Sequence, residues 1–476
     1  MPAKTSEIRK VARSRFGYEA LRPGQEEAIA SLLEKRDTLV VQPTGAGKSA
    51  IYQIAGVMMH GVTVVVSPLI ALQRDQVDSI RDQPHTSAAE LVNSMQKTSE
   101  RRQTLERVSA GEVEFLFLAP EQLQRQDTRE TVRQAHPSLF VVDEAHCITE
   151  WGHDFRPDYL SLGDVIEELG HPAVLALTAT AAAPVREVII ERLRMRDPRV
   201  LVHGFDRPNI SLRADHFERE DDKLDALLKR LRWAERPGIV YTATRKTAEQ
   251  LTASLVAADF QAVCYHAGLR AKERDAIHER FMSGTAEVIV ATNAFGMGVD
   301  KSDIRFVYHY DISDSLDSYY QEIGRAGRDG EPAEAILFYR YANTGIRKFQ
   351  AASTKLRPDK IERVVEALQE GAADTRELAE KAELSPRKTT LVLQRLEDVG
   401  GIRKTEDGVE LVDAAAVPEI ARAAAEQQAE FSKMQRERLE RMEEYASLST
   451  CRREYLLNYF GDGFKGPCGN CDNCGR

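Results

Sequence analysis

The chain has 476 residues, of which 42% are hydrophobic and 29% are charged, and its formal net charge is −10 at pH 7. This composition excludes a disordered or fibrous protein and a generally basic surface, so any contact with nucleic acid requires a local basic cleft. No stretch approaches the apolar length that spans a bilayer, and residues 1–20 lack the continuous apolar core of a secretion signal. We therefore expect a multidomain globular protein in the cytoplasm, with no membrane partner.

Between residues 38 and 180, short apolar runs rich in β-branched side chains alternate with polar, helix-forming stretches. Such alternation predicts a parallel α/β sheet, because parallel strands need helical crossovers. The alternation begins again after the Pro/Gly-containing stretch 203–208, which predicts a second α/β domain. We place the two domains at residues 1–205 and 206–350. The expected strands are 39–41, 62–67, 115–118, 139–143 and 174–178 in the first domain, and 238–241, 262–265, 288–291, 306–309 and 335–339 in the second.

Beyond residue 350, helical patterns replace the strand signal. The order of the expected elements is that of a winged helix-turn-helix, so we predict a small winged-helix-like α+β domain at residues 351–414. A helical linker and a cysteine-rich module are expected to fill residues 415–476. The expected elements are helices at 359–370, 375–381 and 385–399, a small hairpin within 402–412, and a long amphipathic helix at 418–445.

The charge of the winged-helix-like domain leaves its role open. Residues 357–412 carry thirteen acidic and ten basic side chains, a net charge of −3. A structural or protein-binding role and a DNA-binding role are both compatible with this balance. If the domain binds DNA, Arg387, Lys388 and Arg395 on its last helix are the candidate phosphate contacts.

A glycine-rich segment, QPTGAGKS at residues 42–49, follows an expected strand and precedes a helical stretch. In that context backbone N–H groups can surround phosphate oxygens. The first position holds Gln42 where the general phosphate-binding loop has glycine, so a glycine turn without a ligand is the alternative. The expected phosphate contacts are Thr44, Gly45, Ala46, Gly47 and Lys48, with Lys48 reaching the β- and γ-phosphates and Ser49 holding Mg²⁺.

Two carboxylates end a later apolar strand in the sequence VVDEAH at residues 141–146. Asp143 is expected to bind Mg²⁺ through water, and Glu144 to orient or deprotonate the attacking water. An isolated Asp-Glu pair is usually a solvated turn. Together with the glycine-rich loop, the pair predicts ATP hydrolysis.

The second α/β domain contains the sequence YQEIGRAGR at residues 320–328. Arg325 and Arg328 are three residues apart, so they face the same side of a helix or turn. Arginine supplied across a cleft stabilises the charge that develops on a transferred phosphoryl group. We expect both arginines to act in catalysis and Gln321 to contact the nucleotide.

These motifs together resemble those of superfamily 2 helicases, and the segments between them resemble the RecQ family, from about residue 16 to residue 338. The resemblance implies two tandem RecA-like domains, of which the first binds ATP. Residues 16–25, FGYEALRPGQ, are similar to the family's adenine-reading motif. By this resemblance Tyr18 stacks on the base, and Arg22 and Gln25 bond its edge.

Residues 147–159, CITEWGHDFRPDY, look like the aromatic-rich loop that RecQ proteins carry directly after the Asp-Glu-Ala-His box. Trp151 and Phe155 can stack on unpaired bases, and Arg156 can add charge or a cation–π contact. A hydrophobic cluster that caps the sheet is the alternative. Arg74 lies in a segment, SPLIALQRDQ at residues 67–76, that resembles a strand-contacting motif of the family.

Four of the six cysteines lie near the end of the chain: Cys451, Cys468, Cys471 and Cys474. In a reducing compartment such clustering indicates a metal rather than disulfides. Four thiolates suit tetrahedral Zn²⁺ and an iron–sulfur cluster alike. The surrounding sequences, NYFG and PCGNCDNC, resemble the RecQ zinc module and therefore favour structural zinc, with Cys451 in a helix. Unlike the usual family order, the winged-helix-like unit precedes this module, and residues of about 350–446 lie outside the resemblance.

The resemblance implies an ATP-dependent DNA helicase that moves 3′ to 5′ on single-stranded or forked DNA in repair or recombination. Single-strand-binding or other repair proteins are its expected partners. The alternative is a DNA-stimulated ATPase that acts as an ATP-gated clamp or remodeller without separating strands.

Overall fold

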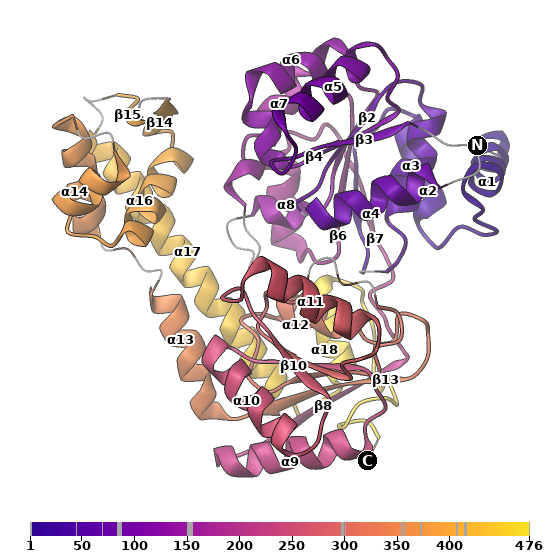
Figure 1. The fold of residues 1–476 in the computed structure, drawn as a ribbon, viewed down its shortest axis with the longest axis vertical. Helices are drawn as coiled ribbons and strands as arrows, with labels where there is room; N and C mark the ends of the chain where they lie inside the picture. The colour runs from indigo at the N-terminus through magenta and orange to yellow at the C-terminus, as the bar shows by residue number, and fades with distance from the viewer. Residues whose placement is uncertain are drawn as a thin grey trace. The chain divides into compact units, whose positions relative to one another are not determined.

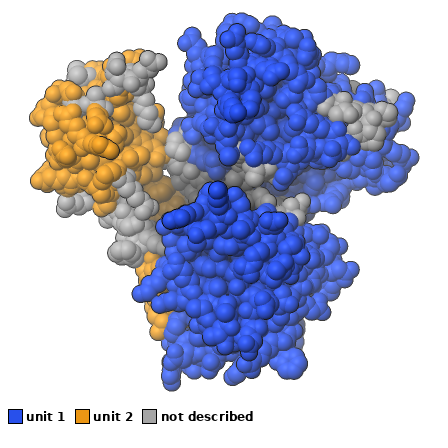
Figure 2. Space-filling view, in the orientation of Figure 1, with its two compact units in different colours: residues 1–312, 316–339, 445–476 blue, residues 313–315, 340–444 orange. Residues whose placement is uncertain are grey.

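The computed structural model describes residues 2–43, 45–68, 70–82, 88–149, 156–296, 299, 301–353, 356, 358–371, 374–405, 408–413 and 417–475. The chain forms two compact units, shown in different colours in Figure 2. Unit 1 contains residues 1–312, 316–339 and 445–476, and unit 2 contains residues 313–315 and 340–444. Within the described residues, no helix is both long and apolar enough to cross a membrane.

The first half of unit 1 is a seven-stranded sheet in the order β3-β4-β2-β5-β6-β1-β7, and every pair of neighbours is parallel. Its strands other than the two at the edges are buried along their whole length, because helices cover both faces. Figure 1 shows α5, α6 and α7 on one side of β2 to β4, and α2 and α3 on the other. The strands are β1 Thr38–Val41, β2 Thr63–Val66, β3 Ala89–Val92, β4 Phe115–Leu118, β5 Leu139–Val142, β6 Ala173–Thr178 and β7 Arg199–Val202. The helices are α1 Pro2–Phe16, α2 Gln25–Leu33, α3 Ser49–Met58, α4 Ile70–Arg81, α5 Thr98–Ser109, α6 Gln126–Gln134, α7 Leu162–Glu168 and α8 Ala183–Arg192, with short 3₁₀ turns at Pro120–Gln124, Ala145–Ile148 and Pro157–Tyr159.

The strand order brings the two expected nucleotide motifs to the same edge of this sheet. The glycine-rich loop follows β1 and the Asp-Glu pair follows β5, and β6 lies between these two strands. Because all strands are parallel, their carboxyl ends meet at one edge, which is where ligands bind in such sheets. Thr178, at the end of β6, is therefore placed between the two motifs.

The second half of unit 1 is a six-stranded parallel sheet in the order β10-β11-β9-β12-β13-β8. Two parallel sheets in tandem confirm the predicted fold class. The strands are β8 Ile210–His216, β9 Gly238–Tyr241, β10 Ala262–Tyr265, β11 Val288–Ala291, β12 Phe306–His309 and β13 Ala333–Tyr339. The helices are α9 Glu220–Trp233, α10 Arg245–Ala257, α11 Ala271–Met282 and α12 Leu316–Ile323, and α18 Arg452–Phe460 joins this half from the end of the chain.

Unit 2 has the helices and the hairpin of the expected winged-helix-like domain. Its core is formed by apolar residues of α14, α15, α16, the hairpin and the start of α17, including Ile361, Leu378, Leu396 and Ala424. Ser385 caps α16 by accepting a hydrogen bond from the backbone N–H of Lys388. The elements are α13 Thr344–Ser353, α14 Pro358–Gln369, α15 Thr375–Lys381, α16 Pro386–Asp398, β14 Ile402–Thr405, β15 Gly408–Leu411 and α17 Val417–Ala446, with a 3₁₀ turn at Tyr341–Asn343.

Arg395 was wrongly expected to be available to phosphates. Its side chain is only 2% exposed and forms an ion pair with Asp398 at 3.1 Å, while its guanidinium lies 4.7 Å from the ring centre of Phe431. Asp398 lies on α16 together with Arg395 and neutralises its charge, as a buried arginine requires. Phe431 lies on α17, so the guanidinium links the two helices inside unit 2. Lys388 is exposed; the side chain of Arg387 lies outside the described residues.

Candidate active site

The glycine-rich loop is held in shape by its own backbone and by α2. Gly45 and Gly47 have φ values of +82° and +79°, a region that favours glycine. A methyl group at Gly47 would lie 2.9 Å from Nε2 of Gln25, so the close approach also requires glycine. Lys48 Nζ donates to the carbonyl oxygens of Gln42 and Pro43, at 2.9 and 3.2 Å. The lysine head therefore lies inside the loop, where a phosphate could replace the two carbonyls.

The residues assigned to adenine recognition gather at this loop. Gln25 Nε2 donates to the carbonyl oxygen of Gly47 at 2.7 Å, and its Oε1 accepts from the backbone N–H of Arg22 at 2.7 Å. The Arg22 guanidinium donates to the carbonyl oxygen of Gly45. Tyr18 donates to Gln53 Oε1 of α3 at 3.1 Å, and burial raises the pKa of its hydroxyl. These side chains thus link residues 18–25 to the glycine-rich loop and to α3.

Gln42, the position at which the loop departs from the general pattern, has a structural role. Its side-chain amide donates to the carbonyl oxygen of Pro23 at 2.9 Å. The hydrogen bond ties the start of the glycine-rich loop to the segment that carries Arg22 and Gln25. A glycine at this position could not make it.

The two carboxylates lie where β5 ends. Glu144 has φ +48°, a left-handed conformation that turns the chain sharply after Asp143. Ser67 donates to Asp143 Oδ2 at 3.5 Å, and Tyr159 donates to the Asp143 carbonyl oxygen at 3.0 Å. Burial, together with the nearby charge of Glu144, raises the pKa of Asp143 to about 7, and Lys48 opposes this shift. A buried carboxylate pair of this kind is suited to bind a divalent cation.

His146 connects the carboxylates to β6, a role that we did not predict from the sequence. Its Nδ1 lies 2.9 Å from Thr178 Oγ1 and 3.4 Å from Glu144 Oε2. Thr178 in turn donates to the carbonyl oxygen of Thr180 at 3.1 Å. The only signal in the sequence was the histidine that ends the Asp-Glu-Ala-His box, four residues after the strand.

The two arginines of the second domain differ in their surroundings. Arg325 is 4% exposed and donates to the carbonyl oxygen of Gly296 within its own domain. Arg328 donates to the carbonyl oxygen of Val299 at 3.0 Å, and a methyl group at Gly45 would lie 3.6 Å from its Cδ. Arg328 therefore reaches the glycine-rich loop, whereas Arg325 supports the segment after β11. Gln321 is buried on α12.

Two cations converge on the loop. Burial lowers the pKa of Lys48; Arg328 lowers it further, and Glu144 and Asp143 oppose the shift. Repulsion between a buried lysine and a nearby arginine is costly unless an anion neutralises it. A bound triphosphate would supply that negative charge. A divalent cation held at Asp143 and Glu144 would neutralise the negative charge that the triphosphate and the two carboxylates add together. The site fits an ATP–Mg²⁺ complex by charge as well as by motif.

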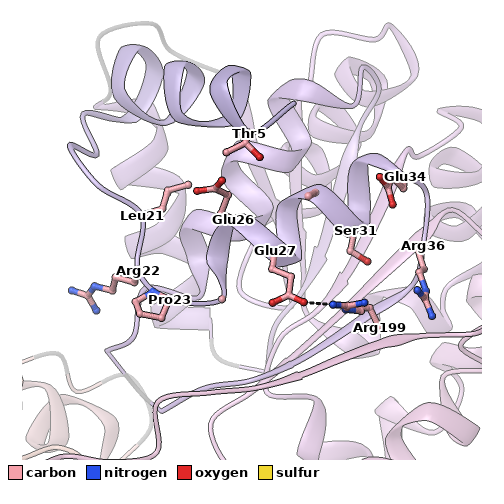
Figure 3. Close-up of a pocket in the computed structure, with 12 residues that line it drawn as sticks. Thr5, Leu21, Arg22, Pro23, Glu26, Glu27, Ser31, Glu34, Arg36 and Arg199 are labelled. Atoms are coloured by element: carbon pink, nitrogen blue, oxygen red, sulfur yellow. Dashed lines mark hydrogen bonds and ion pairs between the residues drawn. The ribbon is translucent and has the colours of Figure 1, made fainter. Parts of the chain in front are cut away.

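A pocket of about 650 Å³ is lined in part by residues 21–24, between α1, α2 and the start of β7 (Figure 3). An ion pair between Glu27 and Arg199 crosses it. Three glutamates and three arginines line the pocket, so it lacks the net positive charge that a triphosphate needs. The charged lining residues are Arg22, Glu26, Glu27, Glu34, Arg36 and Arg199.

The residues expected to contact DNA are only partly within the described structure. Arg74 on α4 is exposed and lies 3.9 Å from the sulfur of Met95, which is 67% exposed. Arg156 is half-buried, and its backbone N–H donates to the carbonyl oxygen of Cys147 at 3.0 Å. Cys147 follows Glu144 by three residues in the sequence. Trp151 and Phe155, as well as Thr44 of the glycine-rich loop, lie outside the described residues.

The four clustered cysteines form a metal-binding geometry. Their Sγ atoms all lie within 4.8 Å of one another. Cys451 is the N-cap of α18 rather than part of a helix, and its sulfur accepts a hydrogen bond from the backbone N–H of Glu454 at 3.5 Å. Burial raises the pKa of Cys468 to about 12, and Cys451 and Cys471 add to this rise. Four such close thiols can all ionise only around a cation, so the donors fit Zn²⁺.

Three family models match the chain. The DEAD/DEAH box helicase model covers residues 22–188, the helicase conserved C-terminal domain model covers 222–330, and the RecQ zinc-binding model covers 410–475. The third model begins well before the first cysteine of the cluster. It therefore includes the whole of α17. Our expectation that residues of about 350–446 lie outside the family resemblance was thus wrong for residues 410–446.

Alignments with individual relatives agree with the family models. The chain is 42% identical over 327 residues to a probable ATP-dependent DNA helicase RecS of Bacillus subtilis, and 34% identical over 460 residues to the ATP-dependent DNA helicase RecQ of Pasteurella multocida. These alignments cover 68% and 96% of this chain but only 64% and 61% of the relatives. A structure of the Mycobacterium smegmatis helicase Lhr, bound to single-stranded DNA and AMP-PNP, has the same fold, with a TM-score of 0.55 and 20% identity over 90% of this chain and 62% of that one.

Proposed function

The chain belongs to the RecQ family of superfamily 2 DNA helicases, and from that membership we propose that it is an ATP-dependent DNA helicase. The observation that carries the proposal is the convergence of Lys48 and Arg328 on the glycine-rich loop, with Asp143 and Glu144 beside it. This arrangement has the components of phosphoryl transfer to water, which depends on positioning and on neutralising charge.

Each residue of the site has a distinct part in this proposal. Backbone N–H groups of residues 44–47 and the Lys48 ammonium hold the phosphates, while Tyr18, Arg22 and Gln25 read the adenine. Ser49 and Asp143 hold Mg²⁺ through oxygen ligands, which this ion prefers. Glu144 orients and deprotonates the attacking water, and Arg328 stabilises charge on the γ-phosphate as the two domains close. For Arg325, which we expected to act in catalysis directly, we now propose a supporting role, because it is buried and donates to the carbonyl oxygen of Gly296. Gln321 contacts the nucleotide from α12.

The substrate of the motor is single-stranded or forked DNA. Arg74, Arg156 and the aromatic pair Trp151 and Phe155 contact the strand, and His146 and Thr178 relay the state of the nucleotide to it. We propose a 3′ to 5′ direction and a role in DNA repair or recombination with single-strand-binding proteins, as in the family. The cysteine-rich, zinc-dependent module suits the reducing cytoplasm.

The first test is steady-state ATP hydrolysis with and without single-stranded DNA, on the wild type and on Glu144→Gln in parallel. We expect DNA to stimulate the wild type strongly and the variant to lose turnover while it still binds ATP. Absence of stimulation in the wild type would favour a nucleotide-gated binding protein. Stimulation without a displaced strand on a forked duplex would instead favour the ATP-gated clamp or remodeller.

The aromatic-rich loop gives a second prediction. Trp151→Ala should uncouple hydrolysis from DNA, because stacking on a base contributes about 1–3 kcal/mol and the loop follows the carboxylates directly. The chain has two tryptophans, and Trp233, which is 87% exposed at the end of α9, provides the matched control. The measurement is the ratio of ATPase rates with and without DNA. An unchanged ratio in Trp151→Ala would favour the alternative, in which the loop is a hydrophobic cluster that caps the sheet.

Removal of the metal tests the cysteine cluster. Cys468→Ser should lower bound zinc from about one ion per chain and lower the Tm, because a structural zinc site stabilises the fold around it. Cys264→Ser, at a half-buried lone cysteine on β10, is the control and should keep its metal. Elemental analysis with thermal unfolding checks both. Iron in place of zinc, or unchanged zinc in Cys468→Ser, would contradict the assignment.

A further inference from the structure

The segment that joins the two halves of unit 1 contacts residues 451–474, which contain α18 and the four clustered cysteines and are here called the cysteine module. Arg453 of α18 pairs with Asp206 and donates to the carbonyl oxygen of Ile210 at 2.6 Å. Asn470, between two of the clustered cysteines, donates to the carbonyl oxygen of Pro208 at 2.8 Å. The ring of Phe460 stacks on Phe205 with a centroid distance of 4.9 Å and an interplanar angle of 5°. Residues 205–210, which we call the connecting segment, are thus held by contacts with residues 453–470.

The same segment holds the loop that carries the two arginines, residues 324–331, here called the arginine loop. The Arg207 guanidinium donates to the carbonyl oxygens of Gly324 at 3.2 Å, Ala326 at 2.9 Å and Gly327 at 2.7 Å. Asn209 Nδ2 donates to the carbonyl oxygens of Gly327 at 2.8 Å and Glu331 at 2.9 Å. The connecting segment therefore binds the backbone of the arginine loop immediately before and after Arg325 and just before Arg328.

The chemistry of Arg207 suits it to position a loop. Among the described residues its guanidinium forms no ion pair within 4 Å, and its hydrogen bonds go to three carbonyl oxygens of one turn. Burial lowers the pKa of this arginine, so its charge is maintained at a cost in free energy. The rigid, planar fork of donors can hold three carbonyls in a fixed relation, which the single ammonium of a lysine cannot do.

We propose that Arg207 is a positioning residue for ATP hydrolysis: it fixes the backbone of the arginine loop so that Arg328 points at the glycine-rich loop. The cysteine module supports Arg207 by holding the connecting segment through Arg453, Phe460 and Asn470. The inference rests on the proposed function, since it assigns to Arg328 the charge-stabilising part of that reaction. Arg207 itself does not touch the nucleotide.

The test compares Arg207→Gln in two backgrounds, the wild type and Arg328→Ala, by DNA-stimulated ATP hydrolysis of the full chain. In the wild-type background kcat should fall on the order of 10- to 100-fold, because a small displacement of a catalytic group is enough for such a loss. KM for ATP should change by less than about twofold, since only transition-state stabilisation is affected. In the Arg328→Ala background the same substitution should cost less than about twofold, since Arg207 acts through Arg328.

Three controls separate positioning from folding. Arg207→Lys should recover part of the kcat that Arg207→Gln loses. Arg213→Gln removes an exposed arginine of β8 that pairs with Asp215, and should leave kcat unchanged. Zinc content and Tm of Arg207→Gln should match the wild type. Equal losses of kcat in both backgrounds, or a raised KM with unchanged kcat, would overturn the role of Arg207 and leave the proposed function in place. A wild type without DNA-stimulated hydrolysis would overturn both.

Discussion

Replacing Arg328 with alanine should lower kcat for DNA-stimulated ATP hydrolysis by about 10³-fold or more, because an arginine that meets the γ-phosphate typically contributes this much. Its Cδ lies 3.6 Å from where a methyl group at Gly45 would be, although the arginine belongs to the second half of unit 1. The interaction forms fully only as charge develops in the transition state. The loss should therefore appear in kcat, with little change in the binding of ATP.

Single-turnover hydrolysis, with nucleotide binding measured separately, checks this prediction. Arg328→Lys should recover only part of the rate, since a lysine lacks the planar fork of the guanidinium. Arg232→Ala, at an exposed arginine of α9 in the same half of unit 1, is the control and should be unaffected. A loss below about tenfold in Arg328→Ala would mean that another cation meets the γ-phosphate.

Lys48→Ala should lower ATP turnover by at least about 10²- to 10³-fold while leaving the fold intact. The substitution removes the hydrogen bonds of the ammonium to the carbonyl oxygens of Gln42 and Pro43. The loop keeps those that Gln25 and Arg22 donate to its backbone, so the fold should be preserved. The loss should affect ATP binding as well as kcat, because the lysine contacts phosphate in both the ground state and the transition state.

Circular dichroism and Tm establish that the Lys48→Ala fold is preserved, and the ATPase assay with DNA gives the rate. Lys10→Ala, at an exposed lysine of α1, is the matched control. DNA-stimulated hydrolysis that persists in Lys48→Ala would refute the assignment of the glycine-rich loop as the phosphate site.

Central strands could be predicted from the sequence, whereas three of the four edge strands of the two large sheets could not; β10 is the edge strand that was predicted. The residues of β1, β2, β4 and β5 are buried along their whole length, and their apolar runs stand out clearly in the sequence. The three strands that we did not predict, β3, β7 and β8, all lie at the edge of a sheet. An edge strand needs less apolar surface, and the burial of Arg199–Val202 and Ile210–His216 is correspondingly interrupted by exposed residues.

Local motifs of the site could be predicted from spacing, because each occupies a few consecutive residues. Contacts between distant segments could not: Arg207 appeared only as part of a Pro/Gly-containing stretch, and its bonds to the arginine loop depend on the folding of both. Arg395 shows the opposite problem. A charged residue on an amphipathic helix is usually exposed, but here Asp398 and Phe431 enclose it.

Strand displacement from labelled duplexes with a single-stranded tail tests whether this chain uses ATP to separate DNA strands. We expect the wild type with ATP to release the labelled strand from a 3′-tailed or forked duplex, and to leave a 5′-tailed duplex largely intact. Glu144→Gln should release none. ATP hydrolysis without strand release on any of these duplexes would contradict the helicase and support an ATP-gated clamp.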